Sequence, residues 1–304
     1  MNLLKNFGLF TLRSQLHAGL LALVFSLAPI FGIPLVAWVA IMIIGLVTLR
    51  HGAGQGFIVL IWSAVPSLVM VFLSTDMYFF SQVLCGGLIV WFLALLLRAH
   101  YPWSVLLEIA AWLAIVVVLV AHLAFGGEIY AWWAAKLHAL IAQYNQAIVD
   151  EDVELMIPKQ ALFYVTHIAT GFLTAMVCLN AVFNLLVARW WQALIFNPGG
   201  LSREFLTIRL SYRLVIGLII AAVLAALRVE WAFDLLPIFL GAFFIAGFSL
   251  MNAWLMRFKR GWIWLLLFYI LLLLRFMIIG AAVMVMAIVD SIVDIRKRWI
   301  VKKS

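Results

Sequence analysis

Long apolar runs, separated by short connectors that carry most of the charge, repeat along the whole 304-residue chain. The runs cover residues 17–31, 34–49, 57–73, 78–97, 103–125, 160–187, 214–227, 233–256 and 262–289. A helix needs about 20 apolar residues to cross the hydrocarbon core of a bilayer. Pro29 and Pro34 would interrupt one long helix over the first two runs, so we expect two short helices joined by a tight turn there. The pattern predicts an all-α, polytopic transmembrane helical bundle with about eight or nine spans.

The stretch between the fifth and sixth runs has a different pattern. Ile129, Trp133, Leu137 and Tyr144 recur at helical spacing, and polar residues lie on the opposite face. Such an amphipathic helix lies in the membrane interface rather than crossing it. It leads into an acidic run at residues 150–154, which fits the outer side because it lacks lysine and arginine.

Composition places a bilayer around most of the chain. The sequence is 68% hydrophobic and 11% charged, whereas soluble proteins are about half apolar and a quarter charged. In a soluble protein the net charge of +8 would suggest a nucleic-acid partner. Here the basic residues lie at the ends of apolar runs, so membrane lipids are the expected partner and nucleic acid is not. Cys85 and Cys178 lie inside apolar runs and are expected to be buried free thiols.

The basic connectors predict a cytoplasmic N-terminus. Counting spans from that end puts Arg50, Arg98, the Arg189–Arg213 cluster and Arg257–Arg260 on the cytoplasmic side. The same count puts the basic tail, from Arg296 onward, on the outside. Either the last run does not cross simply, or residues 128–149 cross and reverse the second half. The side of the C-terminus stays open between these alternatives.

Three motifs carry a family resemblance: LRHGAGQGF at 49–57, ARWWQALIFNPGGLSREF at 188–205 and DSIVDIRKR at 290–298. Over nearly its whole length the chain resembles the YybS-like family of uncharacterised bacterial inner-membrane proteins. That family is distantly similar to the substrate-binding S components of energy-coupling-factor vitamin transporters. The resemblance implies a multi-pass inner-membrane location and the capture of a small molecule. It implies no catalytic residues.

S components are six-helix bundles, so the resemblance also implies how the chain is divided. Residues 1–189 would form an S-component-like module, 190–213 a cytoplasmic interfacial elbow, and 214–304 a three-helix membrane extension with a basic tail. The extension departs from the S-component pattern. Within the elbow an Asn-Pro-Gly-Gly sequence predicts a reversal, after which Ser202 can cap a short amphipathic helix with a stripe of Leu201, Phe205, Ile208 and Tyr212.

Candidate partner-binding residues cluster in this elbow and at the end of the last run. Arginines beside tryptophans can dock a partner or bind lipid headgroups; the alternative is that they set the topology and form an aromatic belt. The two aspartates, one turn apart, form a docking motif or simply end the helix. The candidates are Trp190, Trp191, Asn197, Pro198, Gly199, Gly200, Arg203, Arg209, Arg213, Asp290 and Asp294.

Four polar residues within apolar runs are candidate ligand-binding residues: Arg275, Glu108, Asn180 and Asn184. An arginine at mid-membrane costs about 2.5–3.5 kcal/mol on insertion scales, so Arg275 is expected to bind an anion or to pair with Glu108 or Asp234. Glu108 is a candidate for proton coupling, with a pairing to Arg98 as the alternative. Asn180 and Asn184 can contact a ligand or hydrogen-bond a neighbouring helix.

The chain has no P-loop, GxSxG, HExxH or GxGxxG motif, so no enzymatic activity is predicted. His122 and His167 lack metal-ligand spacing and are expected to be packing residues, and no metal or cofactor is predicted. Two hypotheses follow. The chain binds or translocates a small or lipid-like ligand with partner subunits, or it is a non-transporting scaffold that recruits a membrane or cytoplasmic partner through its basic loop and tail. A cavity lined by Arg275 or Asn184 would favour the first.

Overall fold

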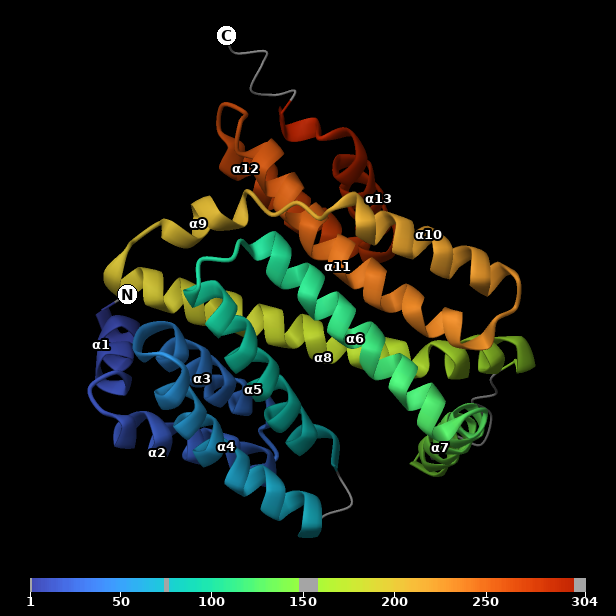
Figure 1. Ribbon diagram of the computed structural model, residues 1–304, viewed down its shortest axis with the longest axis horizontal. Helices are drawn as coiled ribbons and strands as arrows, with labels where there is room; N and C mark the ends of the chain where they lie inside the picture. The colour runs from blue at the N-terminus through green and yellow to red at the C-terminus, as the bar shows by residue number, and fades with distance from the viewer. Residues whose placement is uncertain (1, 74–76, 148–157, 298–304) are drawn as a thin grey trace.

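The computed structural model describes residues 2–73, 77–147 and 158–297, and every regular element in these ranges is a helix. The predicted acidic run at 150–154 lies outside the described residues. The elements are α1 (Asn2–Thr11), α2 (Gln15–Ser26), the 3-10 helices η1 (Ala28–Phe31) and η2 (Pro34–Val36), α3 (Ala37–His51), α4 (Ala53–Leu73), α5 (Met77–Arg98), α6 (Trp103–Phe125), α7 (Glu128–Ala147), α8 (Lys159–Phe196), α9 (Gly200–Phe205), α10 (Tyr212–Ala226), α11 (Glu230–Leu255), α12 (Gly261–Leu274) and α13 (Phe276–Val293) (Figure 1).

Four helices in the described ranges are long and apolar enough to cross a membrane: α6, α8, α11 and α13. A fifth candidate exists if α1 and α2, which are bent by 113° relative to each other, count as one span. In α3, α4, α5, α10 and α12 the apolar helical segments that the structure describes are only 10–17 residues long. The all-α class is therefore confirmed, and helix length and composition by themselves support four to five spans rather than eight or nine.

The helix ends gather at two opposite ends of the molecule (Figure 1). At one end, the Arg98 guanidinium donates hydrogen bonds to the carbonyls of Leu49 at 3.1 Å and Arg50 at 2.9 Å, which joins α5 to α3. The indole of Trp191 donates to the carbonyl of Leu4 at 2.9 Å, so α1 lies against the end of α8. We call this the elbow end, after the segment 197–211 that runs across it, and we call the opposite end the α7 end.

The predicted elbow starts later in the structure than expected, because residues 190–196 belong to α8. α8 continues past Val187 to Phe196, because Trp191 is buried and stacks on Phe7 of α1. The chain does reverse at residues 197–200, where Gly199 has a φ of 83° that favours glycine. Gly199, and not Ser202, holds the N-cap position of α9.

The amphipathic helix that was predicted to follow the reversal at 197–200 is also shorter than expected. α9 ends at Phe205, and the residues after it are not helical up to Tyr212. The predicted stripe therefore does not lie on one helix. The reason is tertiary packing: Ile208 and Leu210 are each only 1% exposed and enter the core from a non-helical segment.

The last apolar run is not a single helix, so the prediction of one span over 262–289 is wrong. α12 ends at Leu274, Arg275 is not helical, and α13 begins at Phe276. Both halves pack on α11: the Tyr269 hydroxyl donates to Asn252 Oδ1 at 2.7 Å, and Phe276 lies beside Phe244. Beyond α13 the chain is back at the elbow end. The run is therefore broken in the structure, and α13 by itself is long and apolar enough to cross a membrane.

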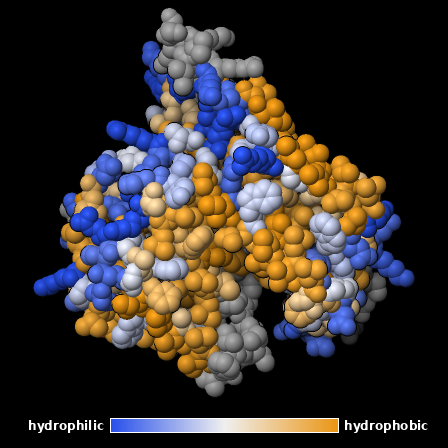
Figure 2. All heavy atoms as spheres, in the orientation of Figure 1, coloured by the Kyte–Doolittle hydropathy of each residue, from blue (hydrophilic) through white to orange (hydrophobic). Residues whose placement is uncertain are grey.

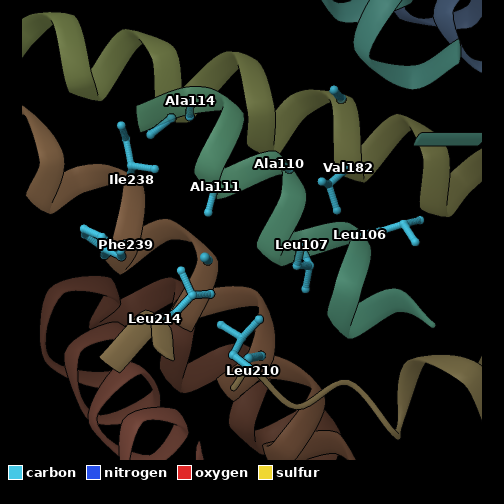
Figure 3. Packing of buried hydrophobic residues seen from close by; sticks show 14 of the residues in the cluster. Leu106, Leu107, Ala110, Ala111, Ala114, Val182, Leu210, Leu214, Ile238 and Phe239 are labelled. Carbon is cyan, nitrogen blue, oxygen red and sulfur yellow. The ribbon is translucent and has the colours of Figure 1, made fainter. Parts of the chain in front are cut away.

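The largest cluster of buried apolar residues joins α3, α5, α6, α8, α10, α11 and α13 with the linker before α10. In α6, Ala110, Ala111 and Ala114 allow close helix approach, and Ile238 and Phe239 of α11 face them (Figure 3). The packing continues across residue 190, so the predicted division there does not coincide with a gap in the core. Figure 2 shows hydrophilic residues gathered toward the elbow end and over α7, with a broad apolar surface between them.

Candidate functional site

A carboxylate lies at the centre of the elbow end. Glu204 of α9 accepts hydrogen bonds from the indole of Trp103 at 3.1 Å and from Arg189 Nε at 3.1 Å, and Arg189 Nη2 also contacts it. Burial acts to raise the pKa of Glu204, but the hydrogen bonds from Arg189 and Trp103 outweigh it, and the pKa lies below its usual value. The contacts fix α9 to α8 and α6.

Three of the predicted partner-binding residues, Arg209, Asp290 and Asp294, are joined by hydrogen bonds and an ion pair. Arg209 Nη1 lies 3.0 Å from Asp294 Oδ2, and its Nε donates to the carbonyl of Asp290 at 3.0 Å. The backbone N–H of Arg209 donates to Ser104 Oγ at 3.0 Å. Arg209, four residues after the motif at 188–205, thus joins the motif at 290–298, and its side chain is turned toward the protein rather than toward a partner.

Arg296 is the central residue of this network, and sequence reasoning did not select it. Its side chain is 14% exposed and lies 3.1 Å from the carboxylate of Asp290, which is 3% exposed. Arg296 Nη2 donates to the carbonyl of Ile208 at 2.7 Å, and Nη1 contacts the carbonyl of Leu206. The sequence signal was its position six residues after Asp290, within the third motif.

The remaining elbow candidates divide into inward and outward residues. Trp191 is buried, and the Asn197 side chain lies against Gly200, where an added Cβ would come within 2.8 Å of it. Trp190, Arg203 and Arg213 are exposed, and neither arginine forms an ion pair within the described residues. Asn197, Pro198 and Gly199 of the turn are exposed as well, so a lipid headgroup or partner can reach all six residues.

The four predicted ligand-binding residues do not form one site, and only Asn180 and Asn184 contact each other. Glu108 accepts the backbone N–H of Ser211 at 2.6 Å, at the start of α10, and does not pair with Arg98. Asn184 is buried, and its amide donates to the carbonyl of Asn180 at 2.8 Å. Arg275 is exposed between α12 and α13 and has no ion pair within the described ranges. None of the four lines a described cavity.

An apolar groove of about 470 Å³ runs between α8, α9 and α11. It begins beside Trp190, and Phe205 of α9 forms part of its wall. The remaining lining residues are Leu179, Phe183, Leu186, Val187, Leu201, Phe244, Ile245 and Phe248. Every lining side chain is apolar or aromatic, so the groove suits an apolar chain.

The α7 end holds a buried carboxylate. Asp234 of α11 is fully buried; its Oδ2 lies 2.8 Å from His122 Nε2 of α6, and its Oδ1 accepts the backbone N–H of Gly171 of α8 at 2.6 Å. His167 of α8 lies 4.0 Å from Glu230. Sequence reasoning treated both histidines as packing residues and Asp234 as a partner of Arg275. The missed signal was that His122, His167 and Asp234 all lie in apolar runs.

No protein-family model, curated protein or solved structure matches the chain. The resemblance to the YybS-like family and the S-component module therefore stay predictions.

Proposed function

We propose that the chain is a multi-pass inner-membrane protein that binds a lipid-like ligand in the groove between α8, α9 and α11. The single observation that carries the proposal is the groove itself, whose lining is wholly apolar. A bilayer-facing groove of this kind takes up an acyl chain, because leaving it empty would forfeit dispersion contacts on both sides.

The residues around the groove suit an amphiphile. Trp190, at 45% exposure, is the kind of residue that lies at the headgroup level of a bilayer. Arg203 is exposed on α9, two residues from Leu201 and from Phe205, so it lies on the face of α9 opposite the groove wall. With Arg213 it makes the surface of the elbow end basic, which favours an anionic headgroup at this end of the molecule while the chain of the ligand occupies the groove. The bound molecule would then be an anionic lipid or a related amphiphile.

The proposal includes a topology. Eight helices would cross the membrane, α2, α3, α4, α5, α6, α8, α10 and α11, and α12 with α13 would form a hairpin that enters from the elbow end and returns to it. Arg50, Arg98, Arg189 and Arg209 all lie at that end, which the positive-inside rule makes cytoplasmic. α2 has 12 residues, about 18 Å of helix, and α3 and α10 have 15 each, about 22 Å. The crossing of these three helices requires local thinning of the bilayer.

The test uses a photoactivatable, clickable fatty acid and the full chain in nanodiscs. We expect labelling to concentrate on peptides that contain Phe183 and Phe244, and Leu186→Trp, which fills the groove, to reduce it at least tenfold. Ile219→Trp, on the exposed face of α10, is the matched control and should leave labelling unchanged. Equal labelling over the whole apolar surface, unaffected by Leu186→Trp, would contradict the proposal.

The alternative function is a scaffold that recruits a protein partner through its basic loop and tail. The exposure of Arg203 and Arg213 favours it. Affinity purification in mild detergent, followed by mass spectrometry of proteins and lipids, separates the two. Retention of a lipid that Leu186→Trp removes supports the groove. A stoichiometric partner that Arg203→Gln with Arg213→Gln releases, with no retained lipid, supports the scaffold.

A further inference from the structure

The α7 end contains a group of ionisable side chains from four helices that the lipid groove does not explain. His122 comes from α6, Tyr130 from α7, His167 from α8, and Glu230 and Asp234 from α11. The other charged or titratable residues of these helices near this end are Glu128, Lys136, His138, Tyr144, Lys159 and Tyr164, and Arg228 lies in the connection before α11. None of them forms an ion pair with the group within the described residues. The group lies within or beside three helices of spanning length.

When the His122 imidazole is neutral and Asp234 is ionised, the pair carries a net charge of minus one. A neutral imidazole donating from Nε2 to the carboxylate leaves a full negative charge at a position with 0% exposure. Gly171 N–H donates to the other oxygen, which offsets part of the desolvation cost but adds no charge. Uptake of one proton by the pair removes the buried net charge.

In the tautomer that its contacts require, neutral His167 has an unprotonated nitrogen, Nε2, that can accept a proton. Its Nδ1 lies 2.7 Å from the carbonyl of Phe163, which can only accept, so Nδ1 carries a hydrogen. In the neutral ring Nε2 is then an unprotonated acceptor. Nε2 faces Glu230 Oε1 across 4.0 Å, too long for a hydrogen bond, and Glu230 is 59% exposed. A proton arriving from water by way of Glu230 would find this nitrogen first.

Tyr130 covers the space between the two histidines. Its ring stacks on His167 with centroids 4.1 Å apart and lies 5.4 Å from His122. Burial, and the nearby Asp234 and Glu230 carboxylates, raise the pKa of Tyr130, so its hydroxyl keeps its proton. α7 is held over the cluster by the Trp133 indole, which donates to Thr170 Oγ1 at 2.9 Å.

We propose that His122 and Asp234 form a proton-binding site within the membrane, reached from the aqueous phase at the α7 end through Glu230 and His167. One proton moves from water to the pair and returns by the same route. Ionisable residues buried between membrane helices commonly mark proton pathways. The site is separate from the groove, so the proposal stands or falls independently of lipid binding.

The test is nuclear magnetic resonance of full-length protein with ¹⁵N-labelled histidine in nanodiscs, titrated with pH. The chain has six histidines, which His→Gln variants assign. We expect the His122 and His167 signals to change protonation state, and Asp234→Asn to weaken proton binding at His122 about tenfold or more. The signals of His17 and His51, which belong to the opposite end, should be the same in Asp234→Asn and in the wild type.

Glu230→Gln keeps the proposal testable if Asp234→Asn does not fold, because Glu230 is exposed. It should weaken proton binding at His167, whereas Glu128→Gln, on α7 at the same end, should not. His122 and His167 signals that stay in one protonation state across the titration would overturn the proposal. So would a His167 titration that Glu230→Gln leaves unmoved.

Discussion

Arg296 Nη2 donates a hydrogen bond to the carbonyl of Ile208 at 2.7 Å, although the two residues are 88 positions apart. This contact brings the segment after α13 back to the linker between α9 and α10. Arg296 also lies 3.1 Å from Asp290, and the pair is almost fully buried. The elbow end is therefore closed by the C-terminal segment.

Arg296→Ala should destabilise the folded protein by about 3 kcal/mol, because removing one member of a buried pair leaves the other without compensation. Lys297→Ala is the matched control, since the Lys297 side chain is 82% exposed. Unfolding in a mild detergent, followed by circular dichroism, measures both. Equal stability of the two variants would show that Arg296 does not hold the elbow.

Glu204 predicts an acid-dependent loss of stability. Its folded-state pKa is lowered below the ordinary value of 4.5, so its contribution is complete above that pH and is lost as the pH falls through the lower, folded-state value. The wild type should be more stable than Glu204→Gln at neutral pH, and this difference in stability should shrink below pH 4.5. Melting temperatures across an acid series test this, with Glu128→Gln as control. A difference that stays constant with pH would refute the assignment.

Gly171→Ala should disrupt the packing of α8 on α11. A Cβ at Gly171 would collide with the backbone of Asp234, which cannot yield without moving α11. We expect loss of more than about 3 kcal/mol of stability or no folded protein. Gly127→Ala has nothing within 4 Å of the added carbon and should fold normally. If Gly171→Ala were as stable as the wild type, α8 and α11 would have to lie farther apart than they do in the structure.

Arg275→Leu should leave folded yield unchanged or improve it. Arg275 is exposed among apolar residues, with Leu274 at 71% and Met277 at 86% exposure. A lipid-exposed arginine costs free energy that leucine does not. Detergent-solubilised yield and melting temperature check this. A marked fall in either would indicate that Arg275 has a structural partner.

The predictable part of the fold was local. The α6 bounds follow from an apolar run that begins at Trp103 and ends before two glycines, and the reversal at Asn197–Gly200 follows from its turn residues. The break at Arg275 could not be read from the sequence, because no proline or glycine stands there and the residues on both sides are apolar. It depends on packing of α12 and α13 against α11.

The site showed the same limit. Asp290 and Asp294 were selected because they are one turn apart, and they do join one network with Arg209. The pairing of His122 with Asp234 spans 112 positions and has no local signal. Glu108 looked like a coupling residue because it is acidic and near a membrane interface. It accepts the N–H of Ser211, a contact that only the non-helical linker creates.

The central claim is that α12 and α13 form a hairpin that returns the chain to the cytoplasmic elbow end. Determining on which side of the membrane the C-terminus lies tests this claim most directly. Fusions of green fluorescent protein and of alkaline phosphatase after residue 304, expressed in bacteria, report the cytoplasmic and periplasmic sides. The same pair inserted after Gly127, at the α7 end, is the internal control for the opposite side. The account predicts fluorescence and no phosphatase activity at the C-terminus, and the reverse at Gly127. Phosphatase activity at the C-terminus would contradict the return of α13 to the elbow end and the topology built on it.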